Sequence, residues 1–275
     1  YHKTFAEYIR AKKLFFDGLP KGAFALTNAD DRNGRVMVQN TAAAVSAYSL
    51  RAMADFRCKI VEMHLDGMLL RIDGQELWVG LLGRFNAYNL LAVYGAAALL
   101  GLNRGEVLRV LSMLHAVSGR FEKIRAANGT TAIVDYAHTP DALENVIQTI
   151  EEIRTPGQQL IVVCGCGGDR DRTKRPEMAA IAVKYATTAV FTSDNPRHES
   201  PEAILDDMVA GLEPGARYLR IADRAEAIRT GVMLSRPGDI ILVAGKGHET
   251  YQIVGDVKHP FDDREEIKKR FALLN

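Results

Sequence analysis

Apolar residues in the second half of the chain occur in short runs that alternate with amphipathic segments. The runs are rich in β-branched residues and predict strands, while the segments between them have the 3.6-residue period of helices. Such alternation is typical of parallel βα units. The predicted strands span residues 131–136, 159–164, 187–193, 217–221 and 239–244, and the predicted helices span residues 140–153, 175–185, 201–212, 223–235 and 262–274.

The first half has a less regular pattern, with one helix, then short β-like runs, then two more helices. Asp73-Gly74 predicts a hairpin turn between antiparallel strands. The first of the two later helices is apolar on nearly all sides, so we expect it to be buried. The predicted helices span residues 4–16, 85–102 and 104–116, and the predicted strands are 22–27, 57–64, 68–72 and 76–79, with a polar loop at 28–34.

These patterns predict an α/β protein with two domains, residues 1–117 and 118–275, divided at Val117-Ser118-Gly119-Arg120. The chain begins at Tyr1 without a Met and enters a helical pattern at once. We therefore expect it to be the later part of a longer protein.

Composition narrows the class of protein. The 275 residues are 47% hydrophobic and 25% charged, as in soluble globular proteins, and the net charge of +1 favours neither nucleic acid nor a membrane surface as partner. The longest apolar stretch, residues 90–102, is too short to cross a bilayer. Three cysteines without metal-binding spacing predict a reduced, cytoplasmic protein.

Four predicted strands end in polar or glycine-rich segments. The carboxyl ends of parallel strands lie on one edge of a sheet, so these segments should converge in space. One binding site built from all four is the expectation. The segments are residues 135–140, 165–171, 194–197 and 245–249.

The segment Asp194-Asn195-Pro196-Arg197 suits a zwitterionic ligand. Pro196 stiffens the turn, Arg197 offers a planar fork for a carboxylate, and Asp194 can accept hydrogen bonds from an ammonium group. By itself the same stretch also fits a solvated turn before a helix that begins at Ser200-Pro201.

The glycines at 165, 167 and 168 allow a ligand to approach the backbone, but the third glycine of a dinucleotide-binding fingerprint is missing. No phosphate-binding P-loop occurs in the sequence. Asp135 and His138 flank a strand-to-helix turn that suits a ribose, or simply a capped helix start. Lys12 by itself fits a solvated charge on the first helix.

Seven ordered motifs together resemble the Mur ligase family of ATP-dependent amide-bond synthetases. The resemblance covers essentially the whole chain and implies the later part of a central ATPase domain followed by a Rossmann-like C-terminal domain with a mostly parallel sheet. The motifs include Tyr8-x-x-Ala11-Lys12, Gly83-Arg84-Phe85-Asn86-x-x-Asn89, Gly119-Arg120-Phe121-Glu122, residues 135–143, Gly165 to Arg175, Asp194 to Arg197, and Gly245 to Glu249.

The resemblance implies ATP and Mg²⁺ as cofactors. ATP would phosphorylate the side-chain carboxylate of a glutamate residue, and an incoming amine would attack the acyl phosphate. Lys12 matches the family lysine that is carbamylated to become a metal ligand, and Arg120 matches an arginine near the phosphates. Asn86 and Asn89 match adenine contacts, and Asp135 and His138 match the ribose side.

For the amino-acid substrate, the resemblance implies the branch that adds meso-diaminopimelate to a UDP-MurNAc-dipeptide in the bacterial cytoplasm, without nucleic acid or membrane partners. Arg197 would distinguish diaminopimelate from lysine, which lacks the distal carboxylate. We expect a monomer, and expect the chain alone to be inactive without the P-loop. The implied pocket comprises Arg170, Asp194, Asn195, Pro196, Arg197, Gly245 and Glu249.

Other functions stay open at this point. A lysine-adding or folylpolyglutamate-type ligase shares the implied fold, although the Asn195-Pro196-Arg197 turn argues for diaminopimelate. Outside the ligase class, the α/β pattern also fits a nucleotide-binding oxidoreductase, and tight NAD binding would favour it. A non-catalytic amino-acid-binding module is the third alternative.

Overall fold

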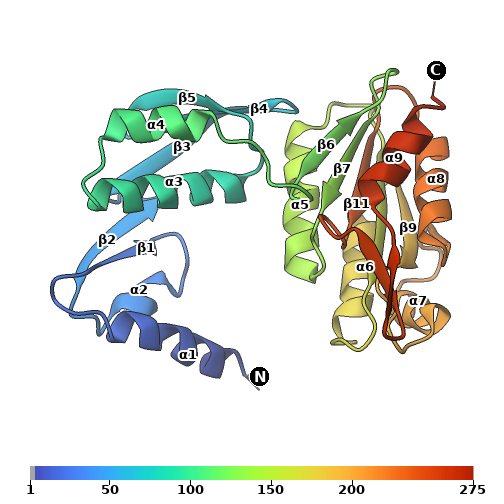
Figure 1. Ribbon diagram of the computed structural model, residues 1–275, viewed down its shortest axis with the longest axis horizontal. Helices are drawn as coiled ribbons and strands as arrows, with labels where there is room; N and C mark the ends of the chain where they lie inside the picture. The colour runs from blue at the N-terminus through green and yellow to red at the C-terminus, as the bar shows by residue number, and fades with distance from the viewer. Residues whose placement is uncertain (1–3, 275) are drawn as a thin grey trace. The chain divides into compact units, whose positions relative to one another are not determined.

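The computed structural model describes residues 4–274, which fall into two compact units divided between His115 and Ala116 (Figure 1). No helix in the described part of the chain has both the length and the apolar character needed to cross a membrane.

The first unit is built on a five-stranded sheet in the order β1-β2-β3-β4-β5. Strands β1 to β3 are parallel, and β3 to β5 are antiparallel. Asp73 and Gly74 both have positive φ, as the predicted hairpin turn requires. The elements are α1 (Phe5–Asp17), β1 (Phe24–Asn28), α2 (Gly34–Val38), β2 (Ala44–Ser49), β3 (Phe56–His64), β4 (Gly67–Ile72), β5 (Gln75–Val79), α3 (Arg84–Leu99) and α4 (Arg104–Ser112).

One helix of this unit differs from expectation. Helix α3 was expected to be buried all round, but only one side packs on the sheet and Val93 is 52% exposed. In α1 the apolar residues Phe5 and Phe15 are exposed, and the buried residue is Lys13, which is paired with Asp17. Apolar content alone could not say which side of a helix is covered.

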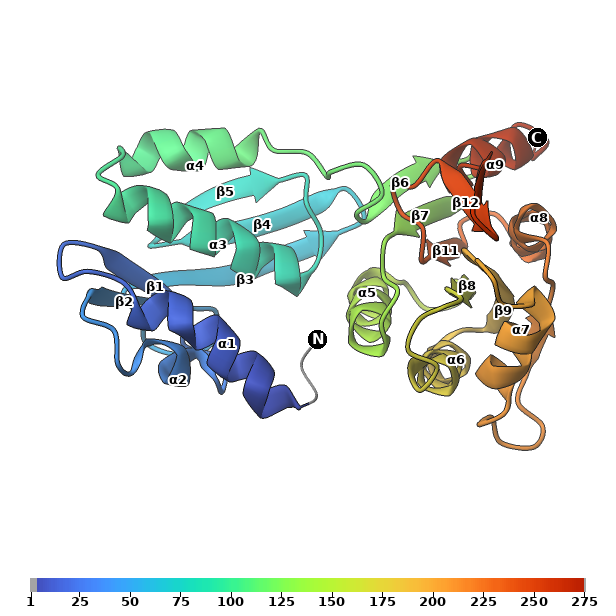
Figure 2. The same cartoon turned by 60° about the horizontal axis from the view of Figure 1, so that its bottom comes forward.

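The second unit is a six-stranded sheet in the order β10-β9-β8-β11-β7-β6, parallel except for β6. Helices α8 and α9 lie on one side of it and α5 and α6 on the other (Figure 2). The elements are β6 (Glu122–Arg125), β7 (Thr131–Asp135), α5 (Pro140–Ile153), β8 (Leu160–Cys166), α6 (Lys174–Tyr185), β9 (Thr188–Ser193), α7 (Pro201–Val209), β10 (Tyr218–Arg220), α8 (Arg224–Leu234), β11 (Ile240–Ala244), β12 (Tyr251–Val254), β13 (Val257–Pro260) and α9 (Asp263–Phe271).

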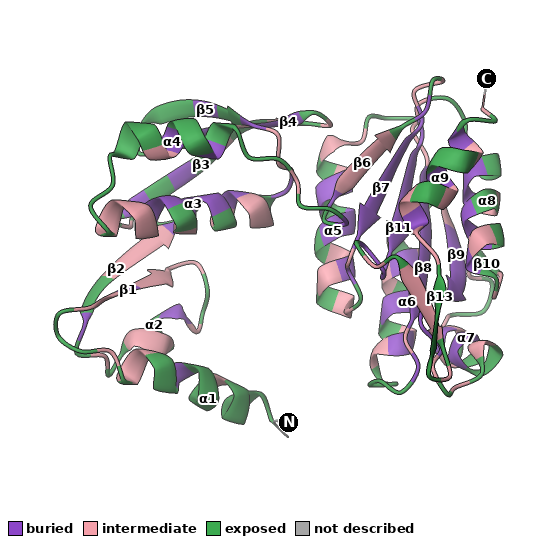
Figure 3. Cartoon of the chain, viewed as in Figure 1, coloured by how far each residue is buried: buried purple, intermediate pink, exposed green. Residues whose placement is uncertain are grey.

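The central strands β7, β8 and β11 are buried along their whole length (Figure 3). Continuous apolar runs are typical of parallel strands covered by helices on both faces. The α/β fold with a mostly parallel sheet, predicted from these runs, is confirmed.

The predicted alignment of strand ends is also confirmed. Ala244 at the end of β11 is in register with Asp135 of β7 and Cys164 of β8, and Ser193 of β9 is in register with Cys166. The polar segments that follow these four strands therefore start from one edge of the sheet. Strand β6 and the β12-β13 hairpin were not predicted from the sequence, because their four-residue strands are too short to show a clear periodicity.

Candidate functional site

Two segments that follow neighbouring strands pack backbone to backbone at the sheet edge. The Gly168 amide donates to the Asn195 carbonyl at 2.9 Å. A Cβ on Gly168 would lie 1.9 Å from the Pro196 carbonyl oxygen, and one on Gly165 would lie 2.2 Å from the Thr192 carbonyl oxygen. The glycines therefore allow the 165–171 loop to lie directly against the 194–197 turn.

Replacing Gly168 with alanine is expected to lower the free energy of unfolding by about 1–3 kcal/mol, because the new methyl group overlaps a backbone oxygen that cannot move alone. Urea denaturation measures the change. Gly22→Ala is the matched control, since a Cβ there has no neighbour within 4 Å, and it should change stability by less than about 0.5 kcal/mol. Equal stability of the two variants would contradict the packing.

Arg197 is held in a fixed position by its backbone and its guanidinium. Its φ is 51°, its amide donates to Ile253 at 3.0 Å, and its carbonyl accepts from Gly255 at 2.7 Å. Its Nη1 donates to the Gly168 carbonyl at 2.9 Å. The 194–197 turn is thus hydrogen-bonded to the β12-β13 hairpin on one side and to the 165–171 loop on the other.

Arg170 and Arg197 flank Gly167. A Cβ built on Gly167 would lie 3.0 Å from Arg197 Nη1 and 3.7 Å from Arg170 Cγ. The Arg170 guanidinium donates only to the Asp169 carbonyl at 3.0 Å, as far as the described residues go. Two arginine side chains that approach the same glycine, with donors to spare, are suited to a carboxylate.

Asn195, Lys246 and Glu249 form a buried hydrogen-bonded group beside this pair. Asn195 Nδ2 donates to Glu249 Oε2 at 2.8 Å, and Lys246 Nζ donates to Asn195 Oδ1 at 3.0 Å. Lys246 Nζ also lies 3.2 Å from Glu249 Oε2. Among the described residues only Oε2 of Glu249 is contacted, so Oε1 remains for a ligand.

Asp194 is 7% exposed, and its carboxylate accepts no hydrogen bond from the described residues. Burial raises the pKa of Asp194, while Arg224 and Lys246 oppose the rise. Gly245 has φ 118°, and a Cβ there would lie 2.5 Å from Asp194 Oδ2. A buried carboxylate without a donor is suited to an ammonium group.

A second cluster surrounds Asp135, at the end of β7. Its carboxylate accepts from the backbone amides of Phe121 and Ala137, both at 2.8 Å, and burial raises its pKa. The Arg120 guanidinium lies 4.7 Å from the centre of the Tyr136 ring. His138 Nδ1 lies 2.8 Å from the Tyr136 carbonyl oxygen. The helix N-cap here is Thr139, so Asp135 is not the capping residue.

The predicted residues of the first unit lie on two helices. Lys12 is exposed on α1, with Nζ 5.5 Å from the centre of the Tyr8 ring. On α3, Asn86 Nδ2 donates to the Leu82 carbonyl at 2.7 Å, and Asn89 Nδ2 lies 3.4 Å from Asn86 Oδ1. The two asparagines therefore lie on the same side of α3.

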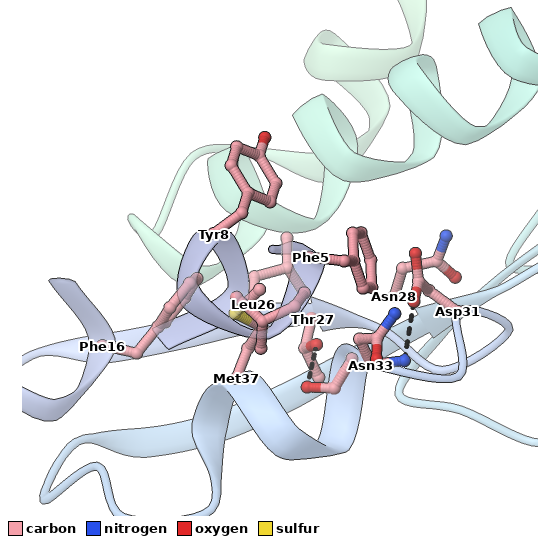
Figure 4. Close-up of a pocket in the computed structure, with 11 residues that line it drawn as sticks. Phe5, Tyr8, Phe16, Leu26, Thr27, Asn28, Asp31, Asn33 and Met37 are labelled. Atoms are coloured by element: carbon pink, nitrogen blue, oxygen red, sulfur yellow. Dashed lines mark hydrogen bonds between the residues drawn. The ribbon is translucent and has the colours of Figure 1, made fainter. Parts of the chain in front are cut away.

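A cavity of about 380 Å³ lies among α1, β1 and α2 (Figure 4). It contains none of the predicted site residues. The lining mixes apolar side chains with the amide and carboxylate groups of the β1–α2 loop: Phe5, Tyr8, Ile9, Phe16, Leu26, Thr27, Asn28, Asp31, Asn33, Gly34 and Met37.

Two residues at the site were not singled out from the sequence. Lys246 is fully buried, and Arg224, also buried, donates to the carbonyls at the ends of β9 and β11. The position of Lys246 between two glycines after a strand was the available signal. Arg224 gave none, because it opens an ordinary helix.

Comparison with protein-family models matches residues 1–97 to the Mur ligase middle domain and residues 119–247 to the Mur ligase glutamate ligase domain. Among curated relatives, the UDP-N-acetylmuramoyl-L-alanyl-D-glutamate--2,6-diaminopimelate ligase of Phocaeicola vulgatus is 57% identical over 99% of this chain and 57% of its own length. The same-named ligase of Cytophaga hutchinsonii is 55% identical over the whole chain and 57% of its own length. The chain thus spans a little over half of these relatives.

Solved structures agree with these matches. A structure of UDP-N-acetylmuramoyl-L-alanyl-D-glutamate--2,6-diaminopimelate ligase has a TM-score of 0.64 and 36% identity, covering 100% of this chain and 58% of the other. MurF ligase from Thermotoga maritima in complex with ADP has a TM-score of 0.71 at 15% identity, covering 98% of this chain and 57% of the other. At that identity the second match supports the fold alone.

Proposed function

The chain belongs to the Mur ligase family, and from this premise we propose that it is part of an ATP-dependent ligase that adds meso-diaminopimelate to UDP-N-acetylmuramoyl-L-alanyl-D-glutamate. The observation that carries the proposal is the approach of Arg170 and Arg197 to Gly167, together with the buried carboxylate of Asp194, to which none of the described residues donates. Together they offer one carboxylate site and one ammonium site.

Diaminopimelate fits this arrangement at its distal end. The two arginines receive the distal carboxylate, while Asp194 and the remaining oxygen of Glu249 receive the ammonium on the same carbon. Lysine has no distal carboxylate and would leave the arginine donors unmatched. The other amine of diaminopimelate is then left to react.

The proposed reaction transfers the γ-phosphoryl group of ATP to the glutamate carboxylate and releases ADP. The amine of diaminopimelate attacks the acyl phosphate, the C–N bond forms and phosphate leaves. Arg120 is proposed to face the phosphates, Asp135 and His138 the ribose, and Asn86 and Asn89 the adenine. These residues act by positioning and by charge, as is general in phosphoryl transfer.

Mg²⁺ is part of the proposal, and when bound it would neutralise phosphoryl charge. Lys12 would contribute an oxygen ligand only as a carbamate. No group of three or more His, Cys, Asp or Glu side chains in the described residues could hold a metal. These residues alone do not build the metal site, so no step is derived through the metal.

We also propose a cytoplasmic setting and a monomer. The three cysteines are buried and unpaired, as suits a reducing compartment. We propose two domains, residues 1–117 and 118–275, with the amino-acid pocket in the second domain.

The test is ADP release by the full-length gene product, given UDP-MurNAc-dipeptide and either meso-diaminopimelate or L-lysine. We expect turnover with diaminopimelate and a preference over lysine of about 100-fold or more in kcat/KM, because unmatched arginine donors penalise lysine. Equal rates, or a preference for lysine, would contradict the proposed substrate. Absence of ADP release with both amino acids would contradict the proposed reaction.

A further inference from the structure

Lys246 is a fully buried cation at the sheet edge. Its relative exposure is 0%, and its ammonium group contacts Asn195 Oδ1 and Glu249 Oε2 at 3.0 and 3.2 Å. Burying an ammonium is costly unless partners replace its water. Both partners are residues that the proposed function assigns to the amino-acid pocket.

The contact with Asn195 decides which way its amide points. Oδ1 receives two donors, Lys246 Nζ at 3.0 Å and the Ile253 amide at 2.9 Å, so an amide nitrogen cannot take its place. Nδ2 must then face Glu249, where it donates at 2.8 Å. Its second hydrogen is left for a ligand. Without Lys246, the Ile253 amide would be the one remaining donor that holds Oδ1 in this position.

Lys246 also sets the charge beneath the pocket. Among the described residues that act on Asp194, Arg224 is paired with Asp263 and Lys246 with Glu249. Three carboxylates therefore face two cations, which leaves one negative charge in excess. One ammonium group of a ligand would balance it.

We propose that Lys246 is a positioning residue that orients the Asn195 amide and limits the group of charges around Asp194 to one uncompensated negative charge, so that the ammonium side of the pocket accepts a single positive charge and a zwitterionic amino-acid end is selected over a purely cationic one. The proposal rests on the proposed function, since it deepens the account of the same pocket. It assigns no contact between Lys246 and substrate.

The test compares Lys246→Met and Lys246→Gln in the full-length gene product. Methionine keeps the volume but removes both the donor and the charge, whereas glutamine keeps a donor. We expect Lys246→Met to raise the KM for diaminopimelate by about 30-fold with little change in the KM for ATP, and Lys246→Gln to give a smaller rise.

Selectivity provides a second measurement. Without Lys246 the group of charges around Asp194 has two uncompensated negative charges, which favours L-lysine, with its net positive charge, over diaminopimelate. The ratio of kcat/KM for diaminopimelate to that for lysine should fall by about 10-fold in Lys246→Met. A residue that only fills space would lower both values together.

The pH profile is the third measurement. Asp194 must be ionised to receive an ammonium, so kcat/KM for diaminopimelate falls as the pH drops through the pKa of Asp194. Lys246 lowers that pKa, so Lys246→Met should move the acid limb to higher pH. The charged and titratable groups that act on Asp194 are Arg224, Lys246, Glu249, Asp263 and the Cys166 thiol.

Lys258→Met is the matched control. Lys258 is exposed, and its Nζ lies 4.3 Å from the centre of the Tyr251 ring, the same ring that Lys246 Nζ approaches at 5.8 Å. The Lys258→Met variant removes an equal charge nearby but does not affect the contacts of Asn195. It should therefore leave both KM values and the selectivity unchanged.

If the wild-type enzyme is active and Lys246→Met leaves both the selectivity and the acid limb of the pH profile unchanged, the proposed role of Lys246 is overturned while the proposed function stands. An equal rise in the KM for ATP, or a collapse of the melting temperature in both Lys246 variants, would assign a structural role and also overturn it. Wild-type enzyme without diaminopimelate-dependent ADP release would overturn the proposed function, and the role of Lys246 with it.

Discussion

Replacing Arg197 with alanine in the full-length gene product is expected to raise the KM for meso-diaminopimelate by about 100-fold, with the KM for ATP almost unchanged. The guanidinium is already held by Gly168, and the backbone of Arg197 is bonded to Ile253 and Gly255, so the wild-type fork is in place before a ligand arrives. Its loss leaves the distal carboxylate with Arg170 alone.

Arg197→Lys separates charge from shape. Lysine keeps the positive charge but lacks the planar fork, so we expect most of the rise in KM to remain. Steady-state ADP release at varied diaminopimelate or ATP measures both constants. Arg172→Ala is the matched control, because Arg172 is 63% exposed in its side chain and pairs with Asp207 instead of facing Gly167. Equal loss for diaminopimelate and ATP would count against the assigned role of Arg197.

Replacing Arg224 with methionine is expected to lower the free energy of unfolding by about 3–5 kcal/mol, because it leaves the buried Asp263 carboxylate without its partner. Both side chains are 0% exposed, with Arg224 Nε 2.7 Å from Asp263 Oδ1. Arg224 also donates to the Ser193 and Ala244 carbonyls at 3.3 and 3.1 Å. The pair thus joins α8 and α9 to the ends of two strands at the site.

Urea denaturation of the chain measures the loss. Arg229→Met on the same helix is the control, because its pair with Glu226 is about half exposed and should contribute less than about 0.5 kcal/mol. Arg224→Met combined with Asp263→Leu should recover most of the stability, since no buried charge is then left alone. If Arg224→Met is as stable as Arg229→Met, the buried pair does not have this role.

The structure adds no support for a nucleotide-binding oxidoreductase, one of the alternatives left open by the sequence. The sequence feature that favoured it was the glycine run at residues 165–168, and those glycines allow two loops to pack closely. None of the relatives reported above is an oxidoreductase. The amide-ligase reading accounts for the same residues without a missing glycine.

Part of the fold could be predicted from the periodicity of apolar residues and from the spacing of turn residues. Buried parallel strands leave continuous apolar runs, so β7, β8, β9 and β11 and the common edge at their ends were predictable. Element types with strong local signals, such as the Asp73-Gly74 turn, were also predictable. The hairpin β12-β13 was not predictable, because four-residue strands are too short to show a clear periodicity. It nevertheless holds Arg197 through backbone hydrogen bonds, and the Ile253 amide donates to Asn195 Oδ1.

The α/β class, the edge where the polar segments meet and, by resemblance, the family follow from the amino-acid sequence alone. How the Asp194-Asn195-Pro196-Arg197 turn is held is seen only in the folded chain: Gly168 and the hairpin fix Arg197, Lys246 orients Asn195, and Arg224 lowers the pKa of Asp194. The periodicity of a strand is a local property, whereas burial and the pairing of charges depend on residues brought together from distant parts of the chain. A lysine or arginine is read as solvated until its neighbours are known, and here Lys246 and Arg224 are fully buried.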